Sequence, residues 1–282
     1  MKAIKFTGIA LTAMLISTGL KAQTTVQNAT VTNVDQALTI PLSEPGKPYK
    51  LNVDLTTGSI KIVAYEGRDV VVLVTPTEQR RREDRETRSG MHRITGGLSM
   101  DVTGHEKNNE VDISSDRPSE QIMLTIKIPQ GATSIKLRTV NGGDITANNI
   151  SGQLEASNTN GSINLTGISG SVVANTTNGE VKVTLKSIDP KAPMAFTSLN
   201  GNVDVTFPAT LRANVKVRAD RGEVYTDFDM AADPSKPKTT KTAKDGMYSL
   251  SIEDWVTGKI GGGGPEMMMK TFNGNIFIRK AK

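Results

Sequence analysis

An internal repeat constrains the fold of this chain more than any single residue does. Each copy has a stretch of alternating apolar residues, then an Asn-Gly pair, then a second alternating stretch. Three clear copies turn at Asn-Gly 141/142, 160/161 and 178/179, and weaker ones turn at Asn200-Gly201, Arg221-Gly222 and Asn273-Gly274. One such unit cannot bury its apolar face alone, so the repeat predicts that successive copies stack on one another.

The clear copies match in register when they are aligned on Asn-Gly. Leu154 then corresponds to Ile135 and Val172, and both neighbouring copies have an apolar residue at the position of Ala156. A solenoid places such equivalent residues directly above one another at strand spacing. Asn-Gly is also a strong hairpin signal, and an antiparallel β-sandwich is therefore the alternative. We predict an all-β fold, a single-stranded β-helix or β-solenoid with coils of roughly 18–22 residues.

The corners and the core of this solenoid follow from residue type. Asn and Gly both tolerate the left-handed backbone of a corner, and stacked Asn amides can bond to the corners above and below. The apolar run 70–74 predicts a strand buried on both faces. We expect the following side chains inside the central coils: Leu154, Ala156, Ile163, Leu165, Ile168, Val172, Ala174, Val181 and Val183.

The N-terminus has the pattern of a secretory signal peptide. Lys2 and Lys5 precede an apolar run that is too short to span a bilayer, and Ala22 ends the segment. We predict that residues 1–22 are removed, which leaves no transmembrane segment in the mature chain and lowers the net charge from +5 to +2 with the loss of three lysines. The expected location is the periplasm, the outer cell surface or the extracellular space. The chain has no cysteine, which excludes disulfides and thiolate metal sites.

The remaining chain divides into three kinds of segment. Residues 23–47 are expected to be a flexible lead-in with a possible edge strand at 37–40, and residues 48–282 are expected to form the solenoid. Two segments depart from the repeat, a charged insertion at 78–93 and a lysine-rich excursion at 229–246. We expect both to be exposed.

No catalytic or metal-binding constellation is evident, so we predict neither catalytic residues nor a metal or other cofactor. His92 and His105 have no ligand partner at a useful spacing. Three consecutive methionines, 267–269, alternate between the two sides of a strand and cannot converge on a metal. The mature chain lacks the basic stripe with stacking aromatics that nucleic acids require, which argues against that partner. We predict a weak, extended binding surface from these outward polar residues: Glu155, Asn164, Asn175, Glu180 and Lys182.

The unit from Leu51 to Ile62 with its Thr57-Gly58 turn, the repeated Thr-x-Asn-Gly-x-Ile turns and the terminal Asn-Gly-x-Ile resemble the bacterial putative adhesin domains, a family of unknown function, over roughly residues 48–282. This resemblance implies an exported β-solenoid at the cell envelope and brings no binding or catalytic residues with it. We therefore expect a non-enzymatic protein that presents a polar surface to a cell-surface or matrix macromolecule, a protein or a polysaccharide. A carbohydrate-active solenoid enzyme and a structural spacer are the alternatives.

Overall fold

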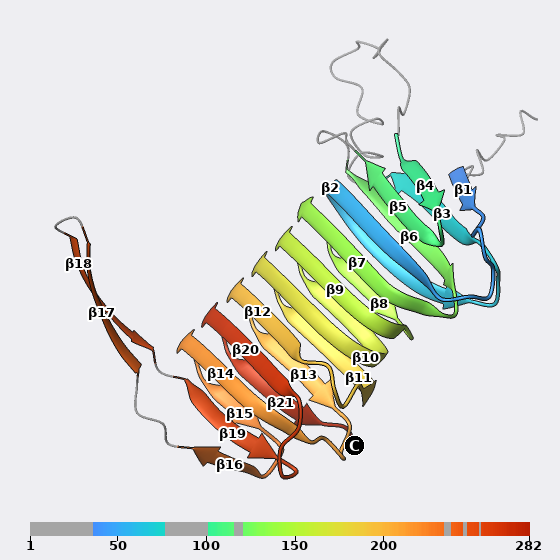
Figure 1. Ribbon diagram of the computed structural model, residues 1–282. Helices are drawn as coiled ribbons and strands as arrows, with labels where there is room; N and C mark the ends of the chain where they lie inside the picture. Colours follow the sequence, from blue (N-terminus) through green and yellow to red (C-terminus); the bar gives the residue numbers. More distant parts are fainter. Residues whose placement is uncertain (1–35, 77–100, 116–120, 234–237, 245–246, 254) are drawn as a thin grey trace, which may run out of the picture. The chain divides into compact units, whose positions relative to one another are not determined.

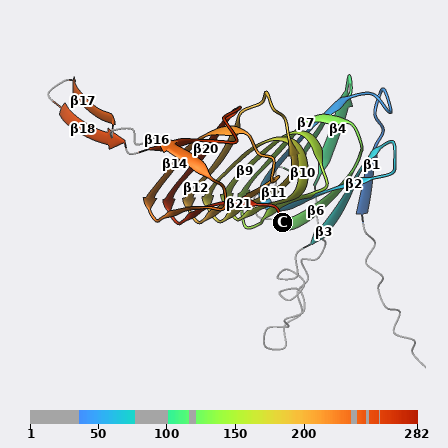
Figure 2. The same ribbon diagram turned by 90° about the horizontal axis from the view of Figure 1, so that it is seen from below.

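Each repeat folds into one coil that consists of a strand, a corner and a second strand. The computed structural model describes residues 36–76, 101–115, 121–233, 238–244, 247–253 and 255–282 (Figure 1). These residues belong to one unit, Asp35–Lys282. The strands before the corners form one layer and those after the corners form a second, and Figure 2 shows how the coils turn from one layer into the other.

Layer A contains the strands that lead into the corners. In spatial order these are β4 (Thr103–Lys107), β5 (Glu110–Ser115), the first half of β2 (Tyr49–Tyr65), β7 (Ala132–Asn141), β9 (Ser151–Asn160), the second half of β10 (Ile163–Asn178), β12 (Met194–Asn200), β20 (Glu266–Asn273), β14 (Ala213–Arg221), β19 (Val256–Ile260) and β16 (Met230–Asp233).

Layer B contains the strands that leave the corners. In the same direction these are β1 (Gln36–Ile40), β3 (Val70–Pro76), β6 (Ile122–Pro129), the second half of β2, β8 (Ile145–Asn148), the first half of β10, β11 (Val181–Ile188), β13 (Val203–Phe207), β21 (Ile276–Lys280) and β15 (Val224–Thr226). A separate antiparallel pair is formed by β17 (Lys238–Lys244) and β18 (Met247–Glu253).

The strands of successive coils pair in parallel and in register, which confirms the solenoid over the sandwich. Leu154 lies beside Val172 in layer A, and Ile163 lies beside Val181 in layer B. Antiparallel strands flank the stack: β4, β3 and β1 at one end, and β19 and β16 at the other. Such strands cover the last coils, whose edges would otherwise stay open to pairing with another chain.

The spatial order of the coils departs from the chain order at both ends. The β2 coil lies between β5–β6 and β7–β8, and the β20–β21 coil lies between β12–β13 and β14–β15 (Figure 1). The corner at Asn273 is the last one along the chain, but in space its coil is the last but one. Because the repeats are equivalent in shape, their pattern does not fix which coil stacks on which.

The predicted core is confirmed for the central coils. All nine side chains expected inside are buried, from Leu154 to Val183. The expectation for residues 70–74 was wrong: β3 buries Val70, Val72 and Val74, whereas Val71 and Leu73 are half-buried. Layer B has only one face against the core, so its strands alternate between buried and accessible residues.

The segments around the solenoid take several forms. The edge strand expected near residues 37–40 is present as β1, and Ser43 Oγ donates a hydrogen bond to Glu106 at 2.8 Å just beyond it. The excursion at 229–246 contains β16, which pairs with β19, and also β17. The charged insertion at 78–93 lies outside the described residues.

An asparagine ladder runs along the edge where the corners stack. Each side-chain amide donates to Oδ1 of the asparagine in the neighbouring coil at 2.7–3.1 Å: Asn160 to Asn141, Asn178 to Asn160, Asn200 to Asn178 and Asn273 to Asn200. The predicted stacking of the corners at 141/142, 160/161 and 178/179 is therefore confirmed.

A second ladder lies inside the corners, two residues before each asparagine. These side chains are polar and buried, and each donates to a corner glycine carbonyl of the neighbouring coil at 2.8–2.9 Å: Thr139 to Gly58, Asn158 to Gly143, Thr176 to Gly161, Ser198 to Gly179 and Thr271 to Gly201. A buried carbonyl without such a donor would be costly, so this ladder makes the polar corner compatible with the apolar core.

Candidate functional site

The five predicted binding residues do not share one face. Glu155 and Asn175 point outward from layer A, whereas Asn164 and Lys182 belong to layer B and Glu180 lies in the corner just before β11. The core lies between the two layers. Strand alternation predicted correctly that these side chains point outward, but it does not say on which side of a corner a strand lies.

The two parts of this set have different surroundings. In layer A, the Asn175 side-chain amide donates to Ser157 Oγ at 2.8 Å, and Glu155 lies beside Val173 in the next strand. In layer B, Asn164 lies beside Lys182. Of the predicted residues, the structure therefore makes only Asn164 and Lys182 strand neighbours.

Layer B ends in a compact arrangement of aromatic and charged side chains. The rings of Tyr225 and Phe277 stack with centroids 5.3 Å apart, and the Arg279 guanidinium lies 4.9 Å from the Phe277 ring centroid. Arg279 Nε also donates to Asp204 Oδ1 at 2.7 Å, and the hydrogen bond and charge of Asp204 raise the pKa of Arg279. A hydrogen bond from the Tyr225 hydroxyl to Glu223 raises the pKa of Tyr225. The charged and hydrogen-bonding groups of this arrangement therefore have their partners within it.

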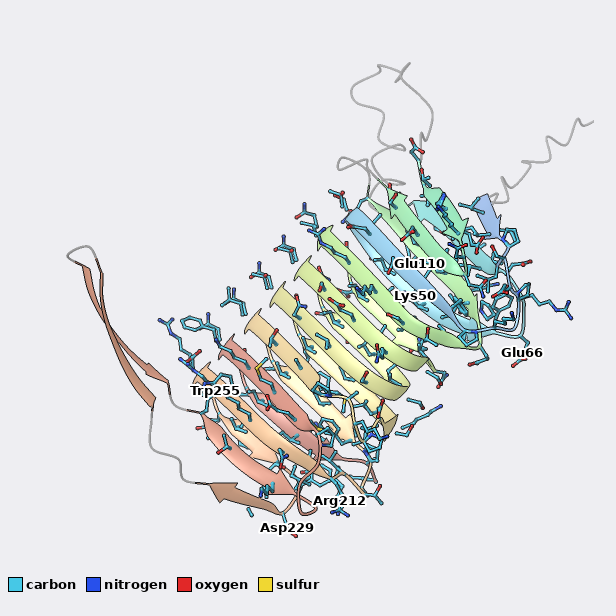
Figure 3. All side chains as sticks on the ribbon, viewed as in Figure 1. Lys50, Glu66, Glu110, Arg212, Asp229 and Trp255 are labelled. Carbon is cyan, nitrogen blue, oxygen red and sulfur yellow. The ribbon has the colours of Figure 1, made fainter. Side chains whose placement is uncertain are left out.

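The outer face of layer A begins with mixed charges at the β5 end. Arg138 Nη1 lies 3.2 Å from Asp54 Oδ2, and Lys50 Nζ lies 3.8 Å from Glu110 Oε2. Figure 3 shows Lys50 and Glu110 at this end, far along the layer from Trp255. Acidic and basic groups alternate here, so this end has no dominant charge.

The centre of layer A is uncharged. On β10 and β12 its outward residues are small, polar or apolar, and Val173 and Leu199 are 40% and 47% exposed. Thr197 lies beside Asn175 in the next strand. This stretch offers hydrogen-bonding groups and apolar contact on a flat surface.

The β14 end of layer A carries a cluster that we call the basic-aromatic patch. It consists of Lys216, Arg218, Arg221, Trp255, Lys270 and Phe272. The Lys216 ammonium lies 4.4 Å from the Trp255 ring centroid, and the Arg221 guanidinium lies 5.0 Å from that of Phe272. Arg218 is the strand neighbour of Lys270. Cations held over aromatic faces in this way are attracted by the negative charge of the ring face.

The sequence reading missed this patch for a topological reason. Its residues come from three separate segments, which meet because β14 pairs with β19 on one side and with β20 on the other. The aromatic residues at 255 and 272 near lysines and arginines were the available signal. Without the spatial order of the coils, that signal could not be assembled.

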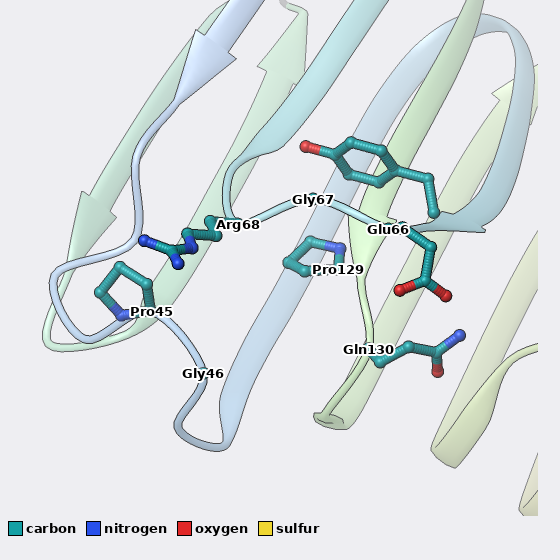
Figure 4. A pocket seen from close by; sticks show the side chains of 8 residues that line it. Pro45, Gly46, Glu66, Gly67, Arg68, Pro129 and Gln130 are labelled. Atoms are coloured by element: carbon teal, nitrogen blue, oxygen red, sulfur yellow. The ribbon is translucent and has the colours of Figure 1, made fainter.

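A pocket lies among the loops at the opposite end of the strands from the Asn-Gly corners (Figure 4). Arg68 lies on its Pro45 side and Glu66 on its Gln130 side, while the Tyr65 ring covers the backbone at residue 67. The Tyr65 hydroxyl donates to the Asp69 carbonyl at 2.6 Å. The pocket thus has one acid and one base on opposite sides, which is not the arrangement of a carboxylate pair.

The described residues show no constellation for metal binding. Nowhere among them do three or more His, Cys, Asp or Glu side chains gather where they could hold an ion. His105 lies in β4 opposite Asp112, and His92 lies outside the described residues. Met267 and Met269 are buried while Met268 points outward, as strand alternation predicted. None of the described residues forms a helix that could cross a membrane.

Residues 141–254 match the family described as Toastrack DUF4097, a domain of unknown function. The resemblance to a family of unknown function is thereby confirmed for these residues. The matched range ends before β20 and β21, which complete the stack. No curated protein matches the chain.

Two crystal structures resemble the chain at low sequence identity. A putative cell adhesion protein from Clostridium sporogenes ATCC 15579 is 12% identical, with 87% of this chain and 98% of that chain covered and a TM-score of 0.40. A putative adhesin from Bacteroides fragilis NCTC 9343 is 13% identical, with 87% and 96% covered and a TM-score of 0.39.

Proposed function

We propose that this chain is an exported, non-enzymatic, adhesin-like protein of the cell envelope, and that layer A presents its binding surface. The partner is a cell-surface or matrix macromolecule with an extended form. The observation that carries the proposal is the outer face of layer A, where an uncharged central stretch continues into the basic-aromatic patch.

The geometry of layer A suits a polymer better than a small ligand. Neighbouring parallel strands place equivalent side chains about 4.8 Å apart, so the outward groups form regular rows. Asn175 and Thr197 are short polar residues that can bond with little loss of side-chain entropy. A flat row of weak contacts gains affinity when a long partner occupies several of them at once.

The placement of the acidic groups supports binding over catalysis. The acids that could have formed a catalytic cluster include Glu155 in layer A and Asp204 in layer B, with the core between the layers, and Glu180 in the corner just before β11. A glycoside hydrolase needs two carboxyl groups on either side of one scissile bond. Asp204, moreover, forms an ion pair with Arg279.

Export is part of the same proposal and rests on residues 1–22. The lysines, the apolar run and Ala22 have the order of a cleaved signal peptide. The mature protein should begin at Gln23, and mass spectrometry of its N-terminus in the exported fraction would check this. An intact Met1 in a membrane fraction would contradict it.

The binding surface can be tested by blocking each layer separately. Asn175 and Thr197 of layer A are replaced together by Tyr, and Asn148 and Thr166 of layer B, which are likewise strand neighbours, are replaced together by Tyr as the matched control. Binding to an envelope fraction from the native cells is measured by co-sedimentation. We expect the layer A variant to bind less and the layer B variant to bind as the parent does. If the parent binds no envelope component, or if the layer A variant binds like the parent, the proposal is wrong.

A further inference from the structure

We propose that the basic-aromatic patch of layer A binds an anionic polysaccharide, a carbohydrate polymer with carboxylate groups along its chain. This inference rests on the proposed function and specifies the chemistry of the partner. The patch lies on β14, β19 and β20, at the end of layer A where Trp255 is seen in Figure 3.

The patch holds cationic groups that have no acidic partner of their own. Among the described residues, no ion pair involves Lys216, Lys270 or Arg221. Arg218 is different, because its Nη2 lies 2.6 Å from Asp220 Oδ1. Three positive charges are thus available to an anionic ligand, whereas Lys50 and Arg138 at the β5 end of layer A lie beside Glu110 and Asp54.

The spacing of these cations suits a polymer whose charges recur along its length. Lys270 is the strand neighbour of Arg218, so the two side chains start about 4.8 Å apart. Lys216 precedes Arg218 by two residues and points to the same side of the strand. Such distances are similar to the size of one sugar ring, so successive carboxylates can meet successive cations.

The apolar part of the patch suits the faces of sugar rings. Phe272 is 37% exposed and Leu199 is 47% exposed. They lie beside each other on the adjacent strands β20 and β12, because the residues on either side of them are aligned across the two strands. Sugar rings present C–H groups that pack against such side chains, while their hydroxyl groups can bond to the nearby Thr197 and Asn175. A carboxylated polysaccharide therefore matches both the patch and the uncharged stretch beside it.

A nucleic acid fits this surface less well. Nucleic-acid sites combine a long cationic groove with aromatic faces open to stacking bases. Here the cations of layer A do not form a continuous groove, because Lys50 and Arg138 at the β5 end lie beside acidic groups and Lys216 lies over the ring of Trp255. The uncharged stretch on β10 and β12 would leave neighbouring phosphates without partners.

The proposal is tested with alginate as the carboxylated probe, dextran as the neutral probe and single-stranded DNA as the competing polyanion. The patch variant is Lys216→Gln with Lys270→Gln. The matched control is Lys61→Gln with Lys127→Gln, which makes the same charge change on layer B. Affinity is measured by isothermal titration at low and at physiological salt, and thermal unfolding confirms that each variant folds. Because Lys216 contacts Trp255, Arg221→Gln provides a second, independent patch variant.

We expect the parent to bind alginate, to ignore dextran and to bind more weakly as salt screens the exposed charges. The patch variant should bind alginate about tenfold more weakly, since it loses two exposed charge contacts. Arg221→Gln should also weaken binding, and the layer B control should not. Tighter binding of DNA than of alginate, equal losses in the patch variant and the control, or no alginate binding by the parent would each overturn the proposal.

Failure of this inference can be told apart from failure of the proposed function. If the parent binds the envelope fraction and the patch variants bind it equally well, the patch is not the site and the broader proposal stands. If neither the parent nor any variant binds the envelope fraction, the proposed function itself fails.

Discussion

The side-chain amide of Asn178 donates a hydrogen bond to Oδ1 of Asn160 at 2.8 Å, across the corners of two neighbouring coils. The same contact continues from Asn200 to Asn178, so each inner asparagine both donates and accepts within the ladder. The ladder has one direction, because every amide points its Nδ2 toward the same end of the stack. This regularity explains why the corners need asparagine rather than any residue that tolerates a turn.

Replacing Asn178 with Asp should break the ladder at its centre. The carboxylate keeps the acceptor that Asn200 uses but removes the donor to Asn160, and it places two acceptors against each other. We expect a loss of about 1 kcal/mol in the free energy of unfolding, measured by urea denaturation above the carboxyl pKa. Asn148→Asp on the outer face of layer B serves as the control, and an equal loss there would show that the ladder is not responsible.

Replacing Gly179 with Ala should be more harmful than a glycine replacement in open space. Gly179 has φ of 156°, and a Cβ atom there would collide with the carbonyl oxygen of Gly161. Gly131 also has positive φ, at 103°, but nothing lies within 4 Å of its added Cβ. We expect Gly179→Ala to cost at least about 1 kcal/mol more than Gly131→Ala in thermal or urea unfolding. Equal losses of stability in the two variants would mean that residue 179 must be glycine because of its backbone conformation, and not because the corners stack closely.

The backbone hydrogen bonds of the corner glycines should set the order in which the Asn-Gly pairs deamidate. Deamidation begins when the glycine nitrogen attacks the preceding asparagine Cγ, with loss of ammonia, and water then opens the ring. The nitrogens of Gly161, Gly179 and Gly201 donate to carbonyls of the neighbouring coil at 2.9–3.0 Å. In the described part of the chain, the corner glycines 142 and 274 make no such backbone bond.

We therefore expect Asn141 and Asn273 to deamidate faster than Asn178 in the folded protein. Peptide mapping by mass spectrometry after incubation at mildly alkaline pH would follow the mass gain at each site. In the urea-unfolded chain, the three sites should react at similar rates. Equal rates in the folded protein would contradict the protective role of the corner bonds.

The stacking of the coils was predictable because it depends on local chemistry that repeats. Register matches such as Leu154 with Val172, and the Asn-Gly corners, gave the coil length, the core and the amide ladder. What the sequence could not supply was the identity of each neighbour. Ile276 pairs with Val203, although Asn273-Gly274 is no more similar to Asn200-Gly201 than to other corners.

The candidate site was less predictable for the same reason. Alternation showed that Glu155 and Lys182 point outward, but their placement on opposite layers depends on the corner between them. Trp255 reaches Lys216 only because β19 pairs with β14. Surfaces that several distant segments build together require the spatial order of the strands, which a repeat pattern leaves open.

The insertion of β20 between β12 and β14 leaves the other edge of β14 free to pair with β19, which brings Trp255 to the basic-aromatic patch. The chain has no cysteine, so engineered pairs can test the order directly. Ala195 and Met268 are strand neighbours and both point outward, whereas β20 separates Ala195 from Lys216.

We predict that Ala195→Cys with Met268→Cys forms a disulfide on mild oxidation, since neighbouring strands bring the two Cα atoms within bonding range. Ala195→Cys with Lys216→Cys should stay reduced, because two strand spacings, about 10 Å, separate its Cα atoms. Intact mass and non-reducing electrophoresis read out both results. A disulfide in the Ala195–Lys216 pair and none in the Ala195–Met268 pair would show that the coils stack in chain order. In that order β14 would have no free edge for β19, so the Lys216–Trp255 contact of the patch would not exist.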